Sequence, residues 1–359
     1  MPSHFSFKRI LIINIFGIGD VLFTTPLISN IKNNIPDSFI GYVCNKRAAA
    51  ILVNNPKVDK IFIYEKDDYR DIAKKSKVEL VKKIFYSLAE IKKENFDLVI
   101  DVSLNKYASF LMWLVGIKKR VGFNYKNRSP FLTRKIKLDG YEGKHVIEYY
   151  LGLLESLGFP ITSRQLEVFI PDEDRAWAEA LLKKNNIADN DSLIGIVPGG
   201  GASWGKDAVY KRWPPERYAQ LADKMVEKFS AKIILLGDTL EKDLCQRVAQ
   251  AMRHGRLEIT GQTSVGQFAA LLAKCKLAVV NDGGPLHVAV AAGTKTVSIF
   301  GPVDENVHGP YPRQGHAVVI KDIACRPCYR RFRKADCEHH NCLNLISVEE
   351  VLEKVEQTL

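Results

Sequence analysis

Short, continuous apolar runs alternate along the first half of the chain with longer segments in which apolar residues recur every three or four positions. Continuous runs are typical of strands that are buried on both faces of a parallel sheet. We predict strands at Lys8–Ile15, Phe39–Cys44, Lys60–Tyr64, Leu98–Asp101 and near Val121. The periodic segments predict helices at about Val21–Asn34, Arg47–Asn54, Val78–Lys93, Tyr107–Val115 and His145–Leu157. This alternation indicates a doubly wound α/β domain.

The same alternation starts again after a break at Gly158-Phe159-Pro160. We predict strands at Leu193–Val197, Lys232–Leu236, Glu258–Ile259, Leu277–Val280 and Thr296–Phe300. Helices are predicted at Glu173–Lys184, Pro215–Phe229, Leu240–Met252, Val265–Ala273 and after Pro285, and a capping box at Ser347 starts a last helix. The chain should therefore form α/β domains over residues 1–165 and 166–345, followed by a terminal helix over residues 346–359.

Length and composition agree with two folded domains. A chain of 359 residues is longer than one hydrophobic core usually supports, and its apolar content of 46% is that of a globular protein. The longest apolar runs reach about half of the ~20 residues that a membrane-spanning helix needs. The run Ile10–Ile18 follows Lys8-Arg9 but has no small-residue cleavage site behind it. We expect a cytoplasmic protein.

The net charge of +11 is concentrated in one half of the chain. Residues 1–160 contain 26 lysines and arginines against 16 acidic residues, a net charge of +10. Such an asymmetry favours an anionic partner for this half, although a basic surface that only aids solubility is the alternative. No nucleic-acid-binding motif is visible, so an anionic membrane surface or an anionic lipid-linked acceptor is the preferred partner. The apolar segment Ala108–Ile117 with its basic edge is best interpreted as a core helix, and a membrane-facing patch is the alternative.

A single carboxylate follows the first predicted strand, in the sequence GIGD at residues 17–20. A dinucleotide-binding motif fits poorly, because its third glycine would fall at Leu22 and no acidic residue follows the second strand. Asp20 nevertheless lies at the carboxyl end of a strand, where open α/β sheets bind ligands. It is a candidate catalytic carboxylate, and a helix-capping aspartate is the alternative.

Two glycine-rich turns of the second half are suited to an anion. Pro198–Ser203 (PGGGAS) follows a strand and can present several backbone N–H groups. At Asp282–Pro285 (DGGP), glycines let the backbone approach a ligand, and proline opens a helix whose free N–H groups suit a phosphate. Lys211 could pair with a diphosphate. The alternatives are a solvated lysine and an ordinary βαβ turn with a capping Asp282 and a packed His287.

The seven cysteines fall into two groups. Cys325, Cys328, Cys337 and Cys342 lie within 18 residues, beside His339 and His340. This spacing allows a structural zinc site, whereas free or reversibly oxidised thiols are the preferred interpretation. Disulfides are rare in the cytoplasm. The remaining cysteines lie in apolar segments and are expected in the core: Cys44, Cys245 and Cys275.

Four sequence motifs, in this order, resemble those of the ADP-heptose:lipopolysaccharide heptosyltransferase family, glycosyltransferase family 9. They are GIGDVLFTTP, PGGGASW with KRWPPERY, DGGPLHVAVAAGTKTVSIFGPVD, and the cysteine segment that begins CRPCYRR. The resemblance implies the GT-B fold, in which two Rossmann-like domains face each other across a cleft and the last helix packs back across the domain junction. It also implies an inverting glycosyltransferase that needs no metal.

The resemblance assigns roles to individual residues. Asp20 would be the general base that deprotonates the acceptor hydroxyl, and Lys211 would pair with the donor diphosphate. Lys206 is a rival to Lys211, because the segment between Trp204 and Trp213 is longer than the family's usual spacing. The remaining donor-binding residues would be Gly200, Gly201, Ala202, Thr239, Thr263, Asp282, Gly283, Gly284 and His287. Gly19 and Arg120 would bind the acceptor.

The expected donor is ADP-heptose, and the expected acceptor is a lipid-linked anionic saccharide of the lipopolysaccharide inner core. We also expect a monomer that makes a transient contact with the inner membrane surface. We expect no nucleic-acid partner. Three alternatives stay open at this point. They are a nucleotide-sugar 2-epimerase on the same fold, a family member with another sugar donor, and a non-catalytic binding module. The charge asymmetry argues against the epimerase, which needs no basic acceptor domain.

Overall fold

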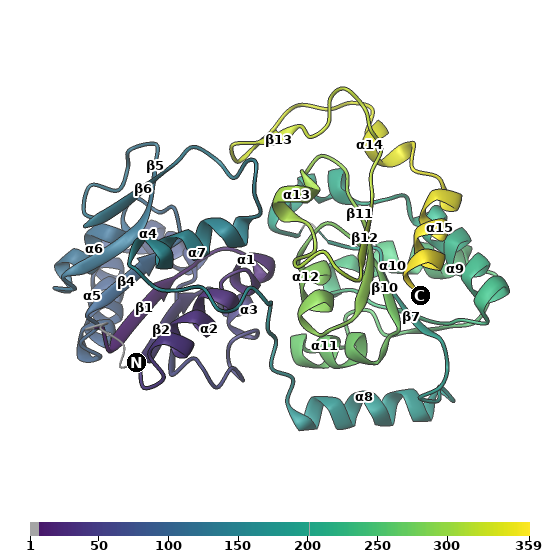
Figure 1. Ribbon diagram of the computed structural model, residues 1–359, viewed down its shortest axis with the longest axis horizontal. Helices are drawn as coiled ribbons and strands as arrows, with labels where there is room; N and C mark the ends of the chain where they lie inside the picture. The colour runs from purple at the N-terminus through teal and green to yellow at the C-terminus, as the bar shows by residue number, and fades with distance from the viewer. Residues whose placement is uncertain (1–6, 201) are drawn as a thin grey trace. The chain divides into compact units, whose positions relative to one another are not determined.

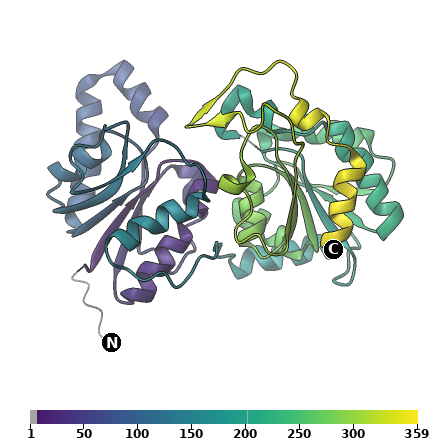
Figure 2. The same ribbon diagram turned by 45° about the horizontal axis from the view of Figure 1, so that its top comes forward.

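The computed structural model describes residues 7–200 and 202–359 (Figures 1 and 2). The chain divides into two compact units, Met1–Arg164 and Gln165–Leu359. The predicted boundary lay between residues 165 and 166, and the predicted terminal helix belongs to the second unit. Each unit is built on one parallel sheet of six strands.

The N-terminal unit has the strand order β3-β2-β1-β4-β5-β6, with β1 at the point where the order reverses. The strands are β1 (Arg9–Ile13), β2 (Phe39–Cys44), β3 (Lys60–Ile63), β4 (Leu98–Asp101), β5 (Lys119–Tyr125) and β6 (Arg134–Leu138). In the register of the central strands, Ile13 pairs with Val43 on one side and with Asp101 on the other. The carboxyl ends of β1 and β4 therefore lie side by side.

Seven helices of the described chain belong to this unit: α1 (Ile18–Leu22), α2 (Thr25–Asn34), α3 (Lys46–Ala49), α4 (Lys66–Lys75), α5 (Lys77–Lys93), α6 (Ala108–Leu114) and α7 (Val146–Ser156). Helices α5 and α6 contribute Ile91 and Met112 to one buried cluster with alternate strand residues such as Leu11 and Val99. Helices α2 and α7 pack against each other. The central strands bury side chains on both faces of the sheet, which explains their continuous apolar runs.

The C-terminal unit has the strand order β12-β11-β10-β7-β8-β9. The strands are β7 (Leu193–Val197), β8 (Lys232–Leu235), β9 (Arg256–Glu258), β10 (Leu277–Asn281), β11 (Lys295–Ile299) and β12 (His316–Val319), and β13 (Tyr329–Arg330) and β14 (Arg333–Lys334) form a small antiparallel pair. The helices are α8 (Asp172–Lys184), η1 (Ala202–Lys211), α9 (Pro215–Phe229), η2 (Thr239–Glu241), α10 (Lys242–Ala251), α11 (Val265–Lys274), α12 (Gly284–Ala291), α13 (Glu305–His308), α14 (Asn341–Asn344) and α15 (Val348–Thr358).

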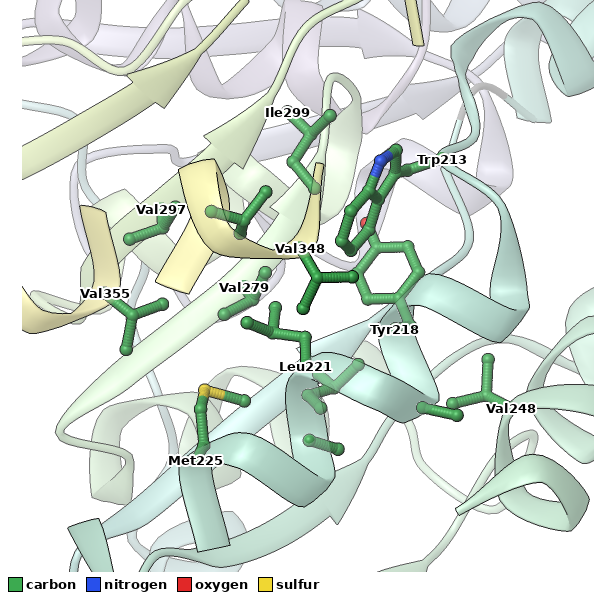
Figure 3. Packing of buried hydrophobic residues seen from close by; sticks show 14 of the residues in the cluster. Trp213, Tyr218, Leu221, Met225, Val248, Val279, Val297, Ile299, Val348 and Val355 are labelled. Carbon is green, nitrogen blue, oxygen red and sulfur yellow. The ribbon is translucent and has the colours of Figure 1, made fainter. Parts of the chain in front are cut away.

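A large buried cluster joins α9 and α15 to the C-terminal sheet (Figure 3). Trp213 is fully buried in it and packs edge-on against Tyr218, with ring centroids 5.0 Å apart. Val348 of α15 packs into the same cluster. The Trp213 Nε1–H donates to the carbonyl of Ile346 at 3.1 Å, which ties the start of α15 to the loop before α9. The packing of α15 back across the domain junction stays a prediction.

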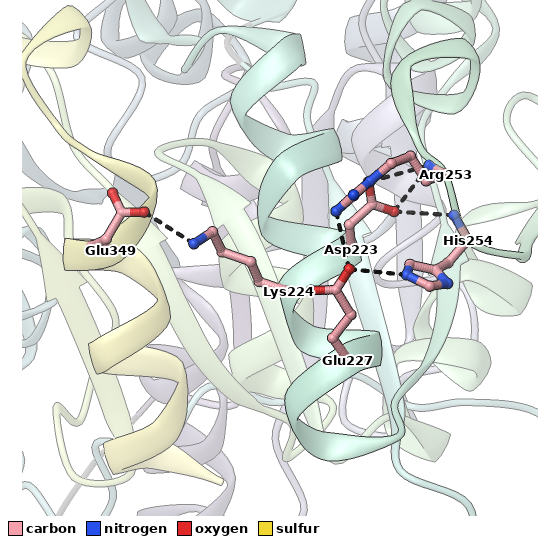
Figure 4. Close-up of polar contacts among 6 residues, drawn as sticks. All are labelled: Asp223, Lys224, Glu227, Arg253, His254 and Glu349. Atoms are coloured by element: carbon pink, nitrogen blue, oxygen red, sulfur yellow. Dashed lines mark hydrogen bonds and ion pairs between the residues drawn. The ribbon is translucent and has the colours of Figure 1, made fainter.

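Polar contacts on the surface of the same unit add to this packing (Figure 4). Asp223 of α9 is buried and accepts hydrogen bonds from the backbone N–H groups of Arg253 and His254 at 3.0 and 3.1 Å. Lys224 lies 3.2 Å from Glu349 of α15. The first contact satisfies the backbone after α10, and the exposed second pair adds little to stability.

The predicted elements agree closely with the structure where the strands are buried. The ranges of β2, β4 and β7 are those expected from the apolar runs. The predicted helix Val21–Asn34 is instead two helices, α1 and α2, because Pro26 lies in the first turn of a new helix. Helix α4 and the strands β6 and β12 were not predicted from the sequence. No helix of the described chain is both long and apolar enough to cross a membrane.

Candidate active site

The site of the C-terminal unit lies where strands β7 and β10 are neighbours at the centre of the sheet. The chain continues from β7 toward one edge of the sheet, through β8, and from β10 toward the other, through β11. Open α/β sheets bind ligands at such a switch point, beyond the carboxyl ends of the strands. The loops after β7, β8 and β10 all begin at this end, and buried polar side chains connect them.

Asn281, the last residue of β10, holds the loop after β7 in place. Its side-chain amide donates to the carbonyls of Pro198 and Gly199 at 2.7 and 3.0 Å. Its oxygen accepts the N–H of Trp213 at 3.0 Å. With 1% of its surface exposed, Asn281 satisfies three backbone groups that water cannot reach.

Glu241 plays the corresponding role between the loops after β7 and β8. Its Oε1 accepts the N–H of Gly200 at 2.6 Å, and its Oε2 accepts the N–H of Asp238 at 3.0 Å. Arg212 reaches the same carboxylate at 3.4 Å and also donates to the carbonyl of Gly200. This buried carboxylate is therefore paired with one cation and two backbone donors, as a buried charge requires.

Gly200 and Gly283 have backbone conformations that favour glycine. Their φ angles are +112° and +155°. A Cβ atom on Gly200 would lie 3.3 Å from the carbonyl oxygen of Asp282, so the two glycine-rich loops pass close to each other. Glycine removes both the steric strain and the close contact at this position.

Lys211 and Asp282 form a buried ion pair. The Lys211 Nζ lies 2.7 Å from Oδ2 of Asp282, and the two side chains are only 9% and 4% exposed. Nζ also lies 4.4 Å from the centre of the Trp204 ring, which in turn packs on Tyr329 at 5.0 Å. Lys206, the rival candidate, is exposed. The structure therefore brings Lys211, and not Lys206, to Asp282 and the start of α12.

The remaining donor-binding candidates differ in their surroundings. Gly284 and Pro285 form the first turn of α12, and His287 is buried in that helix. Thr239 is exposed at the start of η2, and Thr263 is half-buried in the loop before α11. Ala202 begins η1, and Gly201 lies outside the described residues. The loop-holding roles of Glu241, Asn281 and Arg212 were not predicted from the sequence, although Glu241 occupies the acidic position of a capping box that begins at Asp238.

In the N-terminal unit, Asp20 lies in the first turn of α1, directly after β1. Its Oδ2 accepts the N–H of Gly17 at 3.2 Å, and its backbone carbonyl accepts a hydrogen bond from the Asn14 side chain at 2.9 Å. The carboxylate is partly exposed. It also helps to raise the pKa values of the buried Tyr42 and Tyr150 hydroxyls, although burial is the larger cause in both. The cap contact and a catalytic role are compatible, because one carboxylate oxygen can serve each. Gly19 precedes Asp20 within the same helix.

Asp101 is a second carboxylate at this end of the N-terminal sheet. It is the last residue of β4, is 4% exposed, and accepts hydrogen bonds from the backbone N–H and the hydroxyl of Ser103 at 2.9 and 2.6 Å. Burial raises its pKa to about 6, and the Ser103 contacts oppose the shift only in part. From the sequence, Asp101 was predicted only as the last residue of a strand, without a functional role.

Arg120, a predicted acceptor-binding residue, lies in a buried environment lined by backbone carbonyls. Its guanidinium donates to the backbone carbonyls of Phe131, Ile117 and Lys118, and the residue is 8% exposed. Burial lowers its pKa. These contacts fasten the segments on either side of β5, so the structure favours a structural role. Acceptor binding by Arg120 stays a prediction.

The cysteines are free thiols in this structure. Cys44, Cys245 and Cys275 are buried, as expected. Burial raises the pKa of Cys328, and it raises that of Cys342 to about 11, with smaller effects of the neighbouring thiols. Over residues 7–200 and 202–359, no group of three or more His, Cys, Asp or Glu side chains is placed to hold a metal ion.

Comparisons with known proteins agree on one family. The sequence model of glycosyltransferase family 9 (heptosyltransferase) matches residues 86–339. Lipopolysaccharide heptosyltransferase 2 of Escherichia coli (strain K12) is 23% identical over 365 residues, which cover 98% of each chain. A glycosyltransferase family 9 structure from Veillonella parvula DSM 2008 has 25% identity and a TM-score of 0.82, and the match covers 100% of this chain and 98% of that one. The structure of Escherichia coli ADP-heptose lipopolysaccharide heptosyltransferase II has 20% identity and a TM-score of 0.75 over 98% of both chains.

These matches confirm the predicted fold class, α/β of the GT-B type, over nearly the whole chain. The family model covers more than half of the chain and includes the loops after β7, β8 and β10. This match identifies the protein as a glycosyltransferase. It argues against the alternative hypotheses of a 2-epimerase and a non-catalytic binding module. The chain belongs to glycosyltransferase family 9, the heptosyltransferase family.

Proposed function

We propose that the protein transfers a heptose with inversion from ADP-heptose to a lipopolysaccharide inner-core acceptor. The observation that carries the donor side is the buried pair of Lys211 and Asp282 at the start of α12. A buried lysine among glycine-rich turns is suited to a diphosphate, because its ammonium group has three N–H donors and can contact phosphate oxygens while Asp282 holds it in place. Fixed cations and N–H groups then stabilise the leaving diphosphate without a metal.

The donor diphosphate binds the loop that begins at Pro198 and the start of α12 at Gly284. The first N–H groups of α12 have no partner within the helix, and its dipole favours negative charge there. Glu241 and Asn281 do not touch the donor in this scheme. They fix the loops in advance, so that little ordering is required when the donor binds.

Asp20 takes the proton from the acceptor hydroxyl. As that oxygen attacks the anomeric carbon, the bond to the diphosphate breaks on the opposite face, which inverts the configuration. The Gly17 N–H holds one carboxylate oxygen of Asp20 in place. A general base must be oriented toward the proton that it removes, and this contact restricts the rotation of the side chain.

The acceptor is lipid-linked and anionic, in keeping with the net charge of +10 on residues 1–160. The protein works in the cytoplasm as a monomer, with a transient peripheral contact to the inner membrane surface. Exposed lysines attract an anionic acceptor from a distance and contribute less once it is bound. A family member with another sugar donor is the second candidate, because the donor sugar is not determined by the diphosphate contacts.

A panel of ADP-, UDP- and GDP-sugars tests the donor assignment by calorimetry and by thermal shift. We expect ADP-heptose to bind and to raise the melting temperature, and heptose to appear on a Kdo-bearing acceptor. The anomeric configuration of the product, measured by NMR, distinguishes inversion from retention. A response to UDP-sugars alone would overturn the donor, and a retained configuration would overturn the mechanism.

A further inference from the structure

Helix α5 carries an apolar stripe that the N-terminal unit does not cover. Val78, Val81 and Phe85 follow one another at helical spacing, and they are 64%, 64% and 68% exposed. Tyr86 beside them is 68% exposed. A second apolar row of the same helix faces the core, where Ile91 is buried. Helix α5 therefore has two apolar faces, and the fold uses only one.

Lysines surround the uncovered stripe. Between residues 74 and 86 the chain contains five lysines and one acidic residue, Glu79. The lysines are Lys74, Lys75, Lys77, Lys82 and Lys83. Lys82 lies 2.8 Å from Glu79, and Lys83 lies 3.7 Å from Asp68 of α4. These exposed pairs are weak and leave a surface that is apolar along its centre and positive around it.

Helices α4 and α5 form a pair that extends from the rest of the unit (Figure 2). None of the residues of α4 is buried, and Ile91 is the one buried residue of α5. The hydroxyls of Tyr69 and Ser87 lie 2.8 Å apart and join the two helices. An open groove of about 570 Å³ between them is lined by apolar and polar side chains, with three lysines (Lys75, Lys82 and Lys83) against two glutamates (Glu79 and Glu90).

We propose that this surface, the outer face of α5 with its lysines, docks on an anionic lipid bilayer. An amphipathic helix with lysines beside valine and aromatic side chains is suited to the headgroup region. Anionic lipids attract clustered lysines near the membrane. Protein interfaces are instead depleted in lysine, whereas five lysines lie between residues 74 and 86. A second copy of the chain would bring two positive surfaces together, which is unfavourable.

Docking would hold the enzyme on the surface that carries its acceptor. The purpose of the contact rests on the proposed lipid-linked acceptor. The contact itself needs neither donor nor acceptor. Vesicle binding and heptose transfer can therefore fail separately, and one experiment on the full chain can measure both.

The test is co-sedimentation of the full chain with vesicles of phosphatidylcholine alone or of phosphatidylcholine with phosphatidylglycerol. We expect binding to the anionic vesicles and little binding to the neutral ones. Val81→Ser with Phe85→Ser should lower the partition coefficient about tenfold or more, because the apolar contact with the bilayer is lost. Lys75→Gln, Lys77→Gln and Lys82→Gln together should lower it by a similar factor and weaken its dependence on salt.

Matched controls remove exposed groups of the same kind elsewhere in the unit. Val53→Ser removes an apolar side chain that is 67% exposed, and Lys135→Gln with Lys137→Gln removes two exposed lysines of β6. These variants should bind vesicles as the unaltered chain does. All variants should transfer heptose with the unaltered kcat when a lipid-free acceptor is present at a saturating concentration.

Three results would overturn the proposal. The first is no binding of the unaltered chain to anionic vesicles, and the second is equal loss in the controls. The third is a dimer that Val81→Ser with Phe85→Ser dissociates, which would assign the surface to self-association. Vesicle binding without any heptose transfer would refute the proposed function and leave this surface intact.

Discussion

Lys211 and Asp282 are in contact across two loops of the C-terminal sheet, with Nζ 2.7 Å from Oδ2 and both side chains almost fully buried. The pair joins the end of η1 to the loop between β10 and α12. A buried charge that loses its partner is costly, so each residue fixes the position of the other. The contact also keeps the lysine at the place where the donor diphosphate is proposed to bind.

Lys211→Ala should therefore affect both stability and donor binding. Leaving Asp282 unpaired should lower the free energy of unfolding by about 3 kcal/mol. Loss of a charge-assisted contact to phosphate should raise the Kd of ADP about tenfold to a hundredfold. Urea unfolding and calorimetry with ADP measure the two effects. Lys206→Ala, at an exposed position, should change neither.

A double variant separates the two effects of Lys211. Adding Asp282→Asn to Lys211→Ala removes the unpaired charge, so part of the lost stability should return while ADP binding stays weak. If stability and ADP affinity recover together, Lys211 acts only by holding the loops. A larger effect of Lys206→Ala than of Lys211→Ala on ADP binding would assign the diphosphate contact to Lys206.

Asp20→Asn should lower kcat by about two to four orders of magnitude, the range expected for loss of a general base. The amide oxygen of asparagine can still accept the N–H of Gly17, so the helix cap and the melting temperature should be kept. Donor affinity should also be unchanged, because Asp20 belongs to the N-terminal unit. Single-turnover kinetics with calorimetry make the measurement. A variant that retains most of its activity would show that Asp20 is only a cap.

Arg120→Ala should destabilise the N-terminal unit without changing the acceptor KM. The guanidinium donates to three backbone carbonyls in a buried position, and their loss should cost about 2–4 kcal/mol. Lys119→Ala removes an exposed neighbouring charge and is the control. A stable Arg120→Ala variant with a raised acceptor KM would show that this arginine takes part in acceptor binding.

Asp101 should make stability depend on pH in a defined direction. Its folded pKa of about 6 lies above its ordinary value of 3.8, so folding favours the protonated form. Ionisation of Asp101 therefore destabilises the folded state. This destabilisation is absent below pH 4, grows as the pH rises toward 6, and stays constant above pH 6. A pKa shift of about two units lowers the free energy of unfolding by about 3 kcal/mol at most.

Asp101→Asn tests this dependence. Asparagine can still accept both hydrogen bonds from Ser103 and carries no charge, so the variant should be more stable than the unaltered chain at neutral pH. The advantage should disappear below pH 4. Urea unfolding of the two proteins across this range measures the difference, and Asp139→Asn, at an exposed position, should show none. A difference that does not change with pH would contradict the shifted pKa.

The central strands could be predicted because burial on both faces leaves an unbroken apolar run in the sequence. The edge strand β6, RKIKL, is mostly exposed and offers no such run, and β12 at the other sheet's edge is only partly buried. Helix α4 has no buried residue, so its periodicity carries no apolar signal. These elements form because neighbouring strands and helices supply partners, which a local pattern does not contain.

The place of the candidate site could be predicted from chain topology, since ligands bind beyond the carboxyl ends of strands. The side chains that connect the loops could not. Glu241 and Asn281 each reach backbone groups more than forty residues away, and no spacing rule encodes such contacts. The contacts of Arg120 could not be predicted from the sequence either. A basic residue in a basic segment was assigned to an anionic acceptor, whereas its partners are carbonyl oxygens of its own unit.

The excess positive charge of residues 1–160 should make acceptor binding depend strongly on salt. Exposed charges interact over about 10 Å at 0.1 M salt and about 3 Å at 1 M, so an acceptor attracted from a distance loses this attraction as salt rises. A diphosphate held by buried Lys211 and backbone N–H groups is screened less. We expect the KM for a lipid-free anionic acceptor to rise with salt much more than the KM for the donor. Lys118→Gln with Lys119→Gln, at exposed positions that do not belong to α5, should reproduce part of the effect at low salt. A lipid-free acceptor keeps membrane docking out of this measurement. Equal salt dependence of the two KM values would mean that the basic half of the chain has no part in capturing the acceptor.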